Sequence, residues 1–403
     1  MVIVVGSGAG GATVARELAL AGIPVKIIEK GPSIRPKKAF EHYDPSDEGI
    51  DLLKTSCVGG STLVAAGNAV RTLEKELKEM GIDISHEIQE VENDLNVAPL
   101  PDSHFGNGTK MLMESARSLG LPVQKMPKFI RSKDCQPCGK CSFGCPQNAK
   151  WSAADFVAEA IEAGAELITK TQVSKLIVEN GQIKGINALK NSDEMEFFSE
   201  IVILAPGAVE TPRILQKAGI DAGKTFFMDT FITVGGVMED VNFKEEVQMN
   251  ALIKMDNFIL SPHFSTFLSD KLKEKGFNDK DILGFMVKIG DELSGHVDPN
   301  NVVKNNTLQD VRFLAEGAAV AGSILEKTGV KPDSIISTHP RGAHPGGTAP
   351  IGVVVDQNLE TPINGLYVAD ASVIPIAPGG PPLLTIMALS KRLAKHIISK
   401  YYE

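Results

Sequence analysis

The chain has 403 residues, of which 43% are hydrophobic and 23% are charged, and its formal net charge at pH 7 is −9. This composition is typical of a globular protein with a sizeable core, and it excludes a disordered chain, a collagen-like fibre and a disulfide-stapled mini-protein. The acidic balance argues against a nucleic-acid partner. The sequence contains no run of about 18 apolar residues, so it predicts no transmembrane helix.

The N-terminal elements match a dinucleotide-binding pattern. A buried strand at 2–5 precedes three glycines with the spacing of a phosphate-binding turn, and a helix at Ala12–Ala21 and a strand at Val25–Glu29 follow. The glycines are Gly6, Gly8 and Gly11. They allow a tight turn and a close approach of the backbone to a pyrophosphate, while Glu29 would accept hydrogen bonds from a ribose. The pattern predicts a Rossmann-like domain and leaves both FAD and NAD open.

Hydrophobic periodicity predicts the elements of the rest of the chain, after an irregular segment at 31–56. Helices are expected at Arg71–Asn96, Gly108–Leu119, Ser152–Ala163, Leu308–Lys327 and Leu384–Lys400. Strands are expected at Glu166–Thr169, Val173–Glu179, Gly185–Leu189, Ile201–Ala205 and Leu366–Val368, with a turn at Asn180-Gly181. Residues 225–295 are typical of several antiparallel strands.

The order of these elements predicts two domains built from separated segments. Residues 1–70, 135–222 and 336–403 would form the nucleotide-binding domain. Residues 71–134 and 223–335 would form a substrate or cap domain. The fold class expected from this layout is α/β.

Three further segments carry a family resemblance. They are Gly59-Gly60-Ser61-Thr62, the run Ile201-Val-Ile-Leu-Ala-Pro-Gly207-Ala-Val-Glu-Thr-Pro212-Arg-Ile-Leu215, and His344-Pro-Gly-Gly-Thr followed by 365–375. In this order they resemble the Gly-Gly-Ser loop, the "LAAGAIGTPKLL" signature and the carboxyl half of the glucose–methanol–choline (GMC) oxidoreductases. The resemblance implies a Rossmann-like FAD-binding domain with an inserted α+β substrate domain that contains an antiparallel sheet. It also implies FAD contacts at Gly59, Gly60, Ser61, Val173, Ala205, Gly207, Asp370 and Ala371.

The resemblance implies a catalytic role for His344. In that family a histidine at this position takes the hydroxyl proton of an alcohol while a hydride leaves for the flavin, and histidine suits this task because its pKa can lie near the working pH. Taken without the resemblance, His344 is better interpreted as a loop residue that is hydrogen-bonded to backbone. The second polar residue of the family corresponds here to Pro381, which has neither an acid–base group nor an N–H. The family's asparagine after the Gly-Gly-Ser loop corresponds to Ala65, with Asn68 three residues further on. His263, His296 and His339 are the candidates to substitute, and the sequence does not rank them.

Four cysteines form a ferredoxin-like run. They are Cys135, Cys138, Cys141 and Cys145, and Pro146 follows the last of them. Thiolates at this spacing hold an iron–sulfur cluster in bacterial ferredoxins, so the run predicts a [4Fe–4S] cluster with these four ligands. Alternatives are three of them plus Cys57, a zinc site, or cysteines that bind no metal. Some sugar-dehydrogenase relatives within the GMC family carry an iron–sulfur cluster at this place.

A flavin joined to a one-electron cluster predicts a dehydrogenase rather than an oxygen-consuming oxidase. It would transfer a hydride between an alcohol or carbonyl substrate and FAD, and electrons would pass through the cluster to a ferredoxin-like or other redox protein. A cluster-free alcohol oxidase is one alternative. An electron-transfer subunit with a vestigial alcohol site is another, motivated by Pro381. The odd number of cysteines, and an N-terminus that runs directly into a strand, predict a cytoplasmic protein.

Overall fold

Short apolar segments far apart in the sequence pair in a five-stranded parallel sheet. The computed structural model describes residues 1–44 and 50–402, so residues 45–49 of the predicted irregular segment lie outside the described residues. The sheet has the order β18–β10–β1–β2–β6. Its strands are β1 (Val2–Val5), β2 (Val25–Ile28), β6 (Glu166–Ile168), β10 (Val202–Leu204) and β18 (Leu366–Val368). All four residues of β1 are apolar and buried, as expected for the centre of a parallel sheet covered on both faces.

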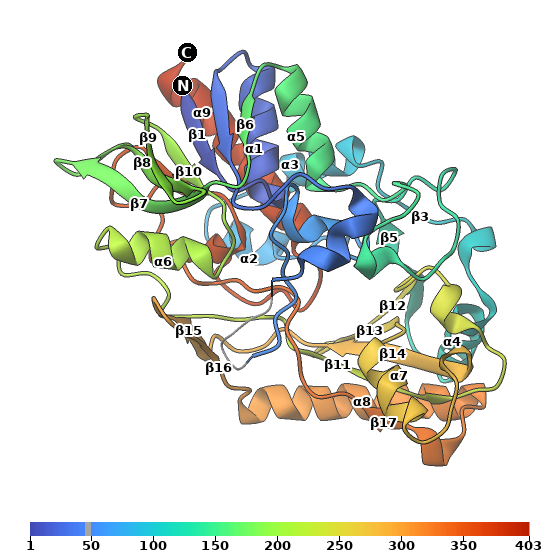
Figure 1. Ribbon diagram of the computed structural model, residues 1–403. Helices are drawn as coiled ribbons and strands as arrows, with labels where there is room; N and C mark the ends of the chain where they lie inside the picture. The colour runs from blue at the N-terminus through green and yellow to red at the C-terminus, as the bar shows by residue number, and fades with distance from the viewer. Residues whose placement is uncertain (45–49, 403) are drawn as a thin grey trace.

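Helices from both ends of the chain pack beside this sheet. They are α1 (Ala9–Leu20), α3 (Ser85–Asp94), α5 (Ala153–Glu162) and α9 (Leu383–Tyr401). Helix α1 packs against α5 and α9, and α9 packs against α3. Figure 1 shows α1, α5 and α9 together in the upper half of the molecule, where both termini also lie. None of the helices in residues 1–44 and 50–402 is both long and apolar enough to span a bilayer.

The continuous helix expected over 71–96 is two helices. They are α2 (Glu74–Glu79) and α3, and Gly81 between them has φ +82°. The side chain of Asp83 then accepts a hydrogen bond from the backbone N–H of Ser85 at 3.0 Å, at the start of α3. A left-handed glycine ends one helix, and a local hydrogen bond from backbone to the Asp83 side chain precedes the next; hydrophobic periodicity does not reveal either feature.

A small antiparallel sheet extends from the parallel one. Its strands are β7 (Gln172–Glu179), β8 (Gln182–Lys190) and β9 (Asp193–Phe198). The predicted turn joins β7 to β8, with positive φ at both Asn180 and Gly181, which is the conformation of a tight hairpin. Strand β9 was not predicted, because three of its first four residues are acidic.

Four antiparallel strands from the predicted region 225–295 join two edge strands that were not predicted, β4 and β17, in a six-stranded sheet of order β17–β11–β14–β13–β12–β4. These strands are β4 (Val123–Lys125), β11 (Phe231–Val237), β12 (Ala251–Lys254), β13 (Ile259–Pro262), β14 (Ile282–Lys288) and β17 (Ile336–Ser337). Helix α8 (Leu308–Thr328) packs on β11 and β14, below the sheet in Figure 1. The other helices and strands are α4 (Asn107–Ser118), α6 (Glu210–Lys217), α7 (Thr266–Lys273), β3 (Ala98–Pro99), β5 (Pro127–Lys128), β15 (Gly295–Val297) and β16 (Val302–Lys304).

The predicted domain boundaries stay a prediction. Two structural facts bear on where they fall: α3 packs on α9 beside the parallel sheet, while β4 pairs with β12 in the antiparallel sheet. Both elements come from the predicted segment 71–134, so this segment contributes to both layers of the molecule.

Candidate functional site

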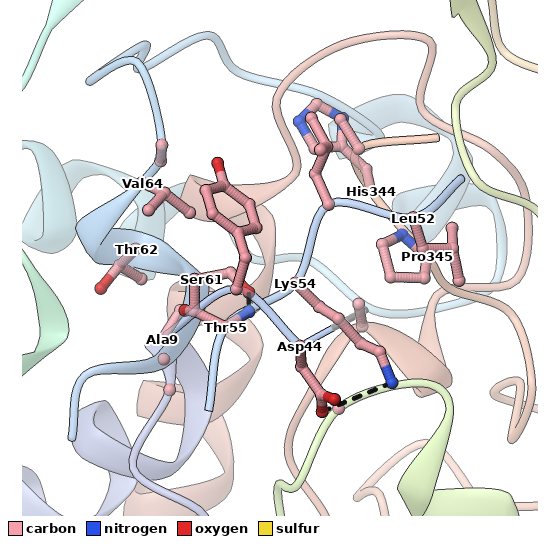
Figure 2. A pocket seen from close by; sticks show the side chains of 18 of the residues that line it. Ala9, Asp44, Leu52, Lys54, Thr55, Ser61, Thr62, Val64, His344 and Pro345 are labelled. Atoms are coloured by element: carbon pink, nitrogen blue, oxygen red, sulfur yellow. Dashed lines mark hydrogen bonds and ion pairs between the residues drawn. The ribbon is translucent and has the colours of Figure 1, made fainter. Parts of the chain in front are cut away.

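A large cavity lies between the parallel sheet and the six-stranded sheet. Its volume is about 1060 Å³, and residues from both layers line it. The parallel-sheet side contributes the turn after β1 and the ends of β2, β10 and β18, and the other side contributes residues of β11, β13 and β14. Figure 2 shows His344 and Pro345 on one side of this space and Ala9, Ser61 and Thr62 on the opposite side. A cavity of this size accommodates a cofactor together with a small substrate.

The three predicted phosphate-binding glycines have different surroundings. A Cβ on Gly6 would lie 2.3 Å from the Ala205 carbonyl oxygen, and one on Gly11 would lie 2.1 Å from the Gly6 carbonyl oxygen. A Cβ on Gly8 would meet no atom within 4 Å. Gly6 and Gly8 line the cavity and Gly11 does not. Gly6 and Gly11 are therefore required by the turn, whereas Gly8 leaves open space at the N-terminus of α1, where a pyrophosphate would bind.

Glu29 ties the end of β2 to this turn. Its Oε2 accepts hydrogen bonds from the backbone N–H of Ser7 at 3.0 Å and from Ser7 Oγ at 2.6 Å. Its Oε1 accepts from the Gly31 N–H at 2.7 Å. Burial raises the pKa of Glu29, and the Ser7 hydrogen bonds oppose that rise. Glu29 lines the cavity, and its Oε1, which accepts one hydrogen bond, keeps a lone pair for a further donor such as a ribose hydroxyl.

The Gly-Gly-Ser loop is hydrogen-bonded to the turn that follows β1. The Gly59 N–H donates to Ser7 Oγ at 3.1 Å, and Ser61 Oγ accepts from the Thr55 N–H at 3.1 Å. The predicted cofactor residues that line the cavity are Gly6, Gly8, Glu29, Gly60, Ser61, Val173, Ala205, Gly207, Asp370 and Ala371. Gly59 lies behind this wall, where a Cβ would contact Leu63 and Ala154.

Asp370 is a buried acceptor that joins β18 to the start of α6. Its Oδ2 accepts from the Gly207 N–H at 2.9 Å and from Thr211 Oγ1 at 2.6 Å, and its Oδ1 accepts from the N–H and hydroxyl of Ser372. Burial raises the pKa of Asp370, while these hydrogen bonds favour the ionised form. Four donors on one carboxylate fix the shape of the cavity wall at this point.

His344 lies on the loop after β17 and has two buried charged neighbours. Its Nδ1 lies 2.8 Å from Asp229 Oδ2 and 3.3 Å from Lys288 Nζ. The His344 side chain is 22% exposed, whereas that of Asp229 is fully buried. Burial and the Lys288 ammonium hold the pKa of His344 well below its usual value, so the imidazole is neutral near pH 7.

Asp229 and Lys288 were not predicted from the sequence. Asp229 precedes β11 in a left-handed backbone conformation with φ +48°, and Lys288 ends the otherwise apolar strand β14. A single lysine at the end of such a strand is a signal that sequence analysis could use, because lysine is rarely buried without a role. Burial raises the pKa of Asp229 and lowers that of Lys288.

The three histidines that could replace the family's second polar residue lie in different places. His263 lines the cavity, as do the two replaced positions, Pro381 and Ala65, and the nearby Asn68. His263 has a buried Nδ1 without a hydrogen-bond partner, and burial lowers the pKa of this side chain to about 4. His339 pairs with Asp51 at 3.2 Å, and His296 is exposed on β15.

The four clustered cysteines lie close together beside the cavity but do not line it. Their neighbours Gly139, Ser142 and Phe143 do. All four thiols are free, and Cys145 Sγ accepts a hydrogen bond from the Ala149 N–H at 3.3 Å. Within the described part of the chain, no three His, Cys, Asp or Glu side chains form a group that could hold a metal ion. The structure therefore gives no direct support to the predicted metal site. Cys57 is buried in a separate cluster with Ala39 and Leu63.

Two buried lysines, also missed in the sequence, stand beside these thiols. Lys128 is 0% exposed and Lys150 is 4% exposed. Lys128 Nζ donates to the oxygens of Ala66, Asn68 and Gln248, and Lys150 Nζ donates to the carbonyls of Thr62 and Leu63. Burial lowers the pKa of each to about 8, and Cys141 has the largest opposing charge effect on both.

Comparison with known proteins agrees with the architecture. Two family models described as GMC oxidoreductase match residues 2–240 and 297–390. An uncharacterised protein of Methanocaldococcus jannaschii, MJ1450, is 34% identical over 400 residues, covering 98% of this chain and 99% of its own. The long-chain-alcohol oxidase FAO3 of Arabidopsis thaliana is 25% identical over 308 residues, covering 64% of this chain and 41% of its own.

Solved structures show the same fold at low sequence identity. A pyridoxine 4-oxidase from Mesorbium loti matches with a TM-score of 0.78 at 16% identity, over 100% of this chain and 99% of that one. A formate oxidase of Aspergillus oryzae RIB40 also matches with a TM-score of 0.78 at 16% identity, over 99% and 98% of the two chains. These matches confirm the predicted α/β fold with a Rossmann-like domain.

Proposed function

Because the chain belongs to the GMC oxidoreductase family, we propose that it is an FAD-dependent enzyme that transfers a hydride between an alcohol or carbonyl substrate and FAD. The observation that carries this proposal is a single cavity lined both by the open turn at Gly8 and by His344, whose imidazole is paired with the buried Asp229. The first feature fits a dinucleotide. The second fits acid–base work on a hydroxyl group.

The residues of the cavity fit FAD. The N-terminus of α1 has no side-chain cap, so its first N–H groups are free to donate to a pyrophosphate. Gly8 leaves the space, and Glu29 offers a carboxylate at the predicted ribose position. FAD, when bound, supplies the hydride acceptor of the reaction.

His344 would act as the base towards a substrate hydroxyl. When its Nδ1–H donates to Asp229, the Nε2 lone pair is left to accept the hydroxyl proton as the carbon gives up its hydride. The low pKa of His344 keeps the ring neutral at pH 7, so its lone pair is available to accept the proton. In the opposite direction the same nitrogen would return the proton to a carbonyl oxygen.

The test is the bleaching of the flavin absorbance under anaerobic conditions. The protein with bound FAD is mixed with a panel of primary alcohols from methanol to dodecanol, benzyl alcohol and pyridoxine. We expect at least one alcohol to reduce the wild-type flavin, and the rate to fall about 100-fold or more in His344→Ala, as for loss of a general base. Reduction of both proteins at equal rates would show that His344 is not the base. Failure of the whole panel to reduce the wild-type flavin would contradict the assigned alcohol chemistry.

We further propose that the Cys135–Cys145 loop binds a [4Fe–4S] cluster. The support is the donor set of four free thiols in one loop, with a backbone N–H already directed at Cys145 Sγ. A zinc ion needs its ligands to meet within about 2.3 Å of one point, whereas a cluster spreads four thiolates over four iron atoms. The ferredoxin-like spacing of the four cysteines is what favours a cluster over zinc.

The two buried lysines also support a cluster. Burying an ammonium group is costly unless negative charge lies nearby. Lys128 and Lys150 donate to neutral oxygens, and Cys135, Cys141 and Cys145 are among the groups whose charge acts on them. The thiolate ligands of a cluster are charged, whereas an unligated cysteine in its thiol form is not. A cluster would supply the missing counter-charge.

Iron and sulfide content tests the cluster. Protein purified without oxygen should contain about four irons and four sulfides per FAD, since each iron of such a cluster takes one of the four cysteines. Cys138→Ser should lower both contents, and Cys57→Ser is the matched control because Cys57 is buried in a different cluster of residues. Wild-type protein with FAD but no iron, or equal iron in wild type and Cys138→Ser, would contradict the proposal.

A cluster would pass electrons singly to an external acceptor, so we propose a ferredoxin-like or other redox protein as the partner. An alcohol that reduces the flavin should then give little hydrogen peroxide in air and faster turnover with added ferredoxin. Hydrogen peroxide formed in a one-to-one ratio with the oxidised alcohol would instead identify a cluster-free oxidase.

A further inference from the structure

The pair formed by Asp229 and His344 has a third member, Lys288. Its Nζ lies 3.3 Å from the same nitrogen, His344 Nδ1, that lies 2.8 Å from Asp229 Oδ2. Lys288 also lies 3.3 Å from the backbone carbonyl oxygen of Asp229 and is 3% exposed. A single ring nitrogen cannot donate to Asp229 and accept from Lys288 at the same time. The two neighbours therefore favour opposite tautomers of His344.

We propose that Lys288 is a positioning residue that, together with Asp229, sets which nitrogen of His344 carries the proton and keeps the ring neutral. This inference rests on the proposed role of His344 as the base.

The electrostatic reason is direct. With Asp229 ionised, Nδ1–H donates to it and Nε2 is the free base. A proton taken up at Nε2 would create an imidazolium ion about 3 Å from the Lys288 ammonium, and like charges at that distance disfavour the charged ring. Lys288 therefore favours release of the proton from His344 after each turnover, while Asp229 holds the ring in one orientation.

The other groups around His344 do not remove this effect. Asp291 acts on both His344 and Lys288, but it is already paired with the buried Lys304 at 2.8 Å. A backbone hydrogen bond at Gly380 stabilises the protonated ring, and so acts against Lys288. Asp229 also accepts the Gly379 N–H at 3.0 Å, which helps to keep this carboxylate ionised. Lys288 is thus the cation that opposes protonation of the ring.

The test is a nitrogen NMR titration of the protein with bound FAD, labelled with ¹⁵N-histidine, with His344→Gln identifying the His344 signals. In wild type we expect a neutral ring with its proton on Nδ1 and a midpoint well below pH 6.5. Lys288→Met should raise the midpoint by about one pH unit or more, and Lys288→Arg should leave it close to wild type. Asp229→Asn should reduce the share of the Nδ1–H tautomer.

An unchanged midpoint in Lys288→Met overturns the inference. If that variant does not fold, an unchanged tautomer ratio in Asp229→Asn together with a shifted midpoint in Lys288→Arg overturns it as well. The proposed function fails separately. Flavin reduction by an alcohol together with an unchanged midpoint in Lys288→Met refutes only the role of Lys288. The expected midpoints without reduction by any alcohol refute only the alcohol chemistry.

Discussion

Gly8 differs from Gly6 and Gly11 of the same turn in the space that is available for an added Cβ atom. A Cβ would collide with backbone at Gly6 and Gly11, whereas at Gly8 it would enter the cavity. Gly8 has φ −71° and ψ −168°, a conformation open to any residue. Substitution at Gly8 should therefore affect the cofactor and leave the fold intact.

Gly8→Val should lower FAD retention about tenfold or more, which corresponds to roughly 1.4 kcal/mol of binding energy. The measurement is the FAD-to-protein ratio after gel filtration. Gly322→Val is the matched control, because Gly322 lies in α8 with no atom within 4 Å of a built Cβ and does not line the cavity. Equal FAD content in the two variants would show that the pyrophosphate does not bind at α1.

The pH dependence of alcohol oxidation follows from the low pKa of His344. A base works when it is deprotonated, so a lowered pKa moves the acid limb of the profile to lower pH. Protonation of His344 should lower kcat/KM for oxidation only well below pH 6.5. Burial raises the pKa of Asp229 to about 7, so the variant Asp229→Asn separates its titration from that of His344. A fall between pH 8 and 7 that persists in Asp229→Asn would contradict a neutral His344.

The sequence located the residues of local motifs and missed those that meet only in the fold. Gly8, Glu29 and His344 stand in recognisable segments. Asp229 lies 115 residues from His344 in the chain and 59 residues from Lys288, so no spacing pattern connects them. Lys128 and Lys150 were missed for the same reason, because their burial beside the thiols depends on tertiary contacts.

At the scale of elements, prediction succeeded where one period dominates the segment. Strand β1, helix α1 and helix α8 follow simple apolar patterns and were found within a few residues of their ends. The prediction of one continuous helix over 71–96 is wrong at Gly81, because the positive φ of this residue interrupts the helix although the charge pattern of the sequence continues. Strand β9 was not predicted, because its position at the edge of the sheet lets its acidic side chains stay in solvent.

The contact between α1 and β18 depends on Gly10. A Cβ there would lie 1.7 Å from the Ala369 carbonyl oxygen. Gly10→Ala should therefore lower the free energy of unfolding by about 3 kcal/mol, since the helix must move off the sheet. The measurement is urea unfolding followed by circular dichroism. Gly8→Ala, two residues away in open space, should lower it by less than about 1 kcal/mol. Equal losses would show that α1 does not pack on β18 as described.

At the scale of the whole molecule, both layers are needed to complete the cavity. The phosphate-binding turn comes from the parallel sheet, while Lys288 comes from the six-stranded sheet and His344 from the loop after its edge strand β17. The cysteine loop lies beside this cavity, since its residues Ser142 and Phe143 line the wall. A cluster held there would stand next to the bound cofactor.

The buried lysines should influence a cluster through charge. Reduction makes a cluster more negative, so a nearby cation stabilises the reduced form and raises the potential. Lys128→Met should therefore shift the reduction potential of the cluster to a more negative value, measured by spectroelectrochemistry. Lys304→Met, at a buried lysine paired with Asp291, is the control. Equal potentials in wild type and Lys128→Met would contradict the proposed counter-charge.

The identity of the nucleotide released on denaturation tests the central claim most directly. The wild-type protein, purified from cells without added cofactor, is denatured, and the supernatant is analysed by chromatography with absorbance and fluorescence detection. One FAD per chain is the predicted result, because the turn at Gly8, the carboxylate of Glu29 and the family all indicate this cofactor. A nicotinamide dinucleotide in its place, or a protein that neither carries FAD nor takes it up when it is supplied, would contradict the account.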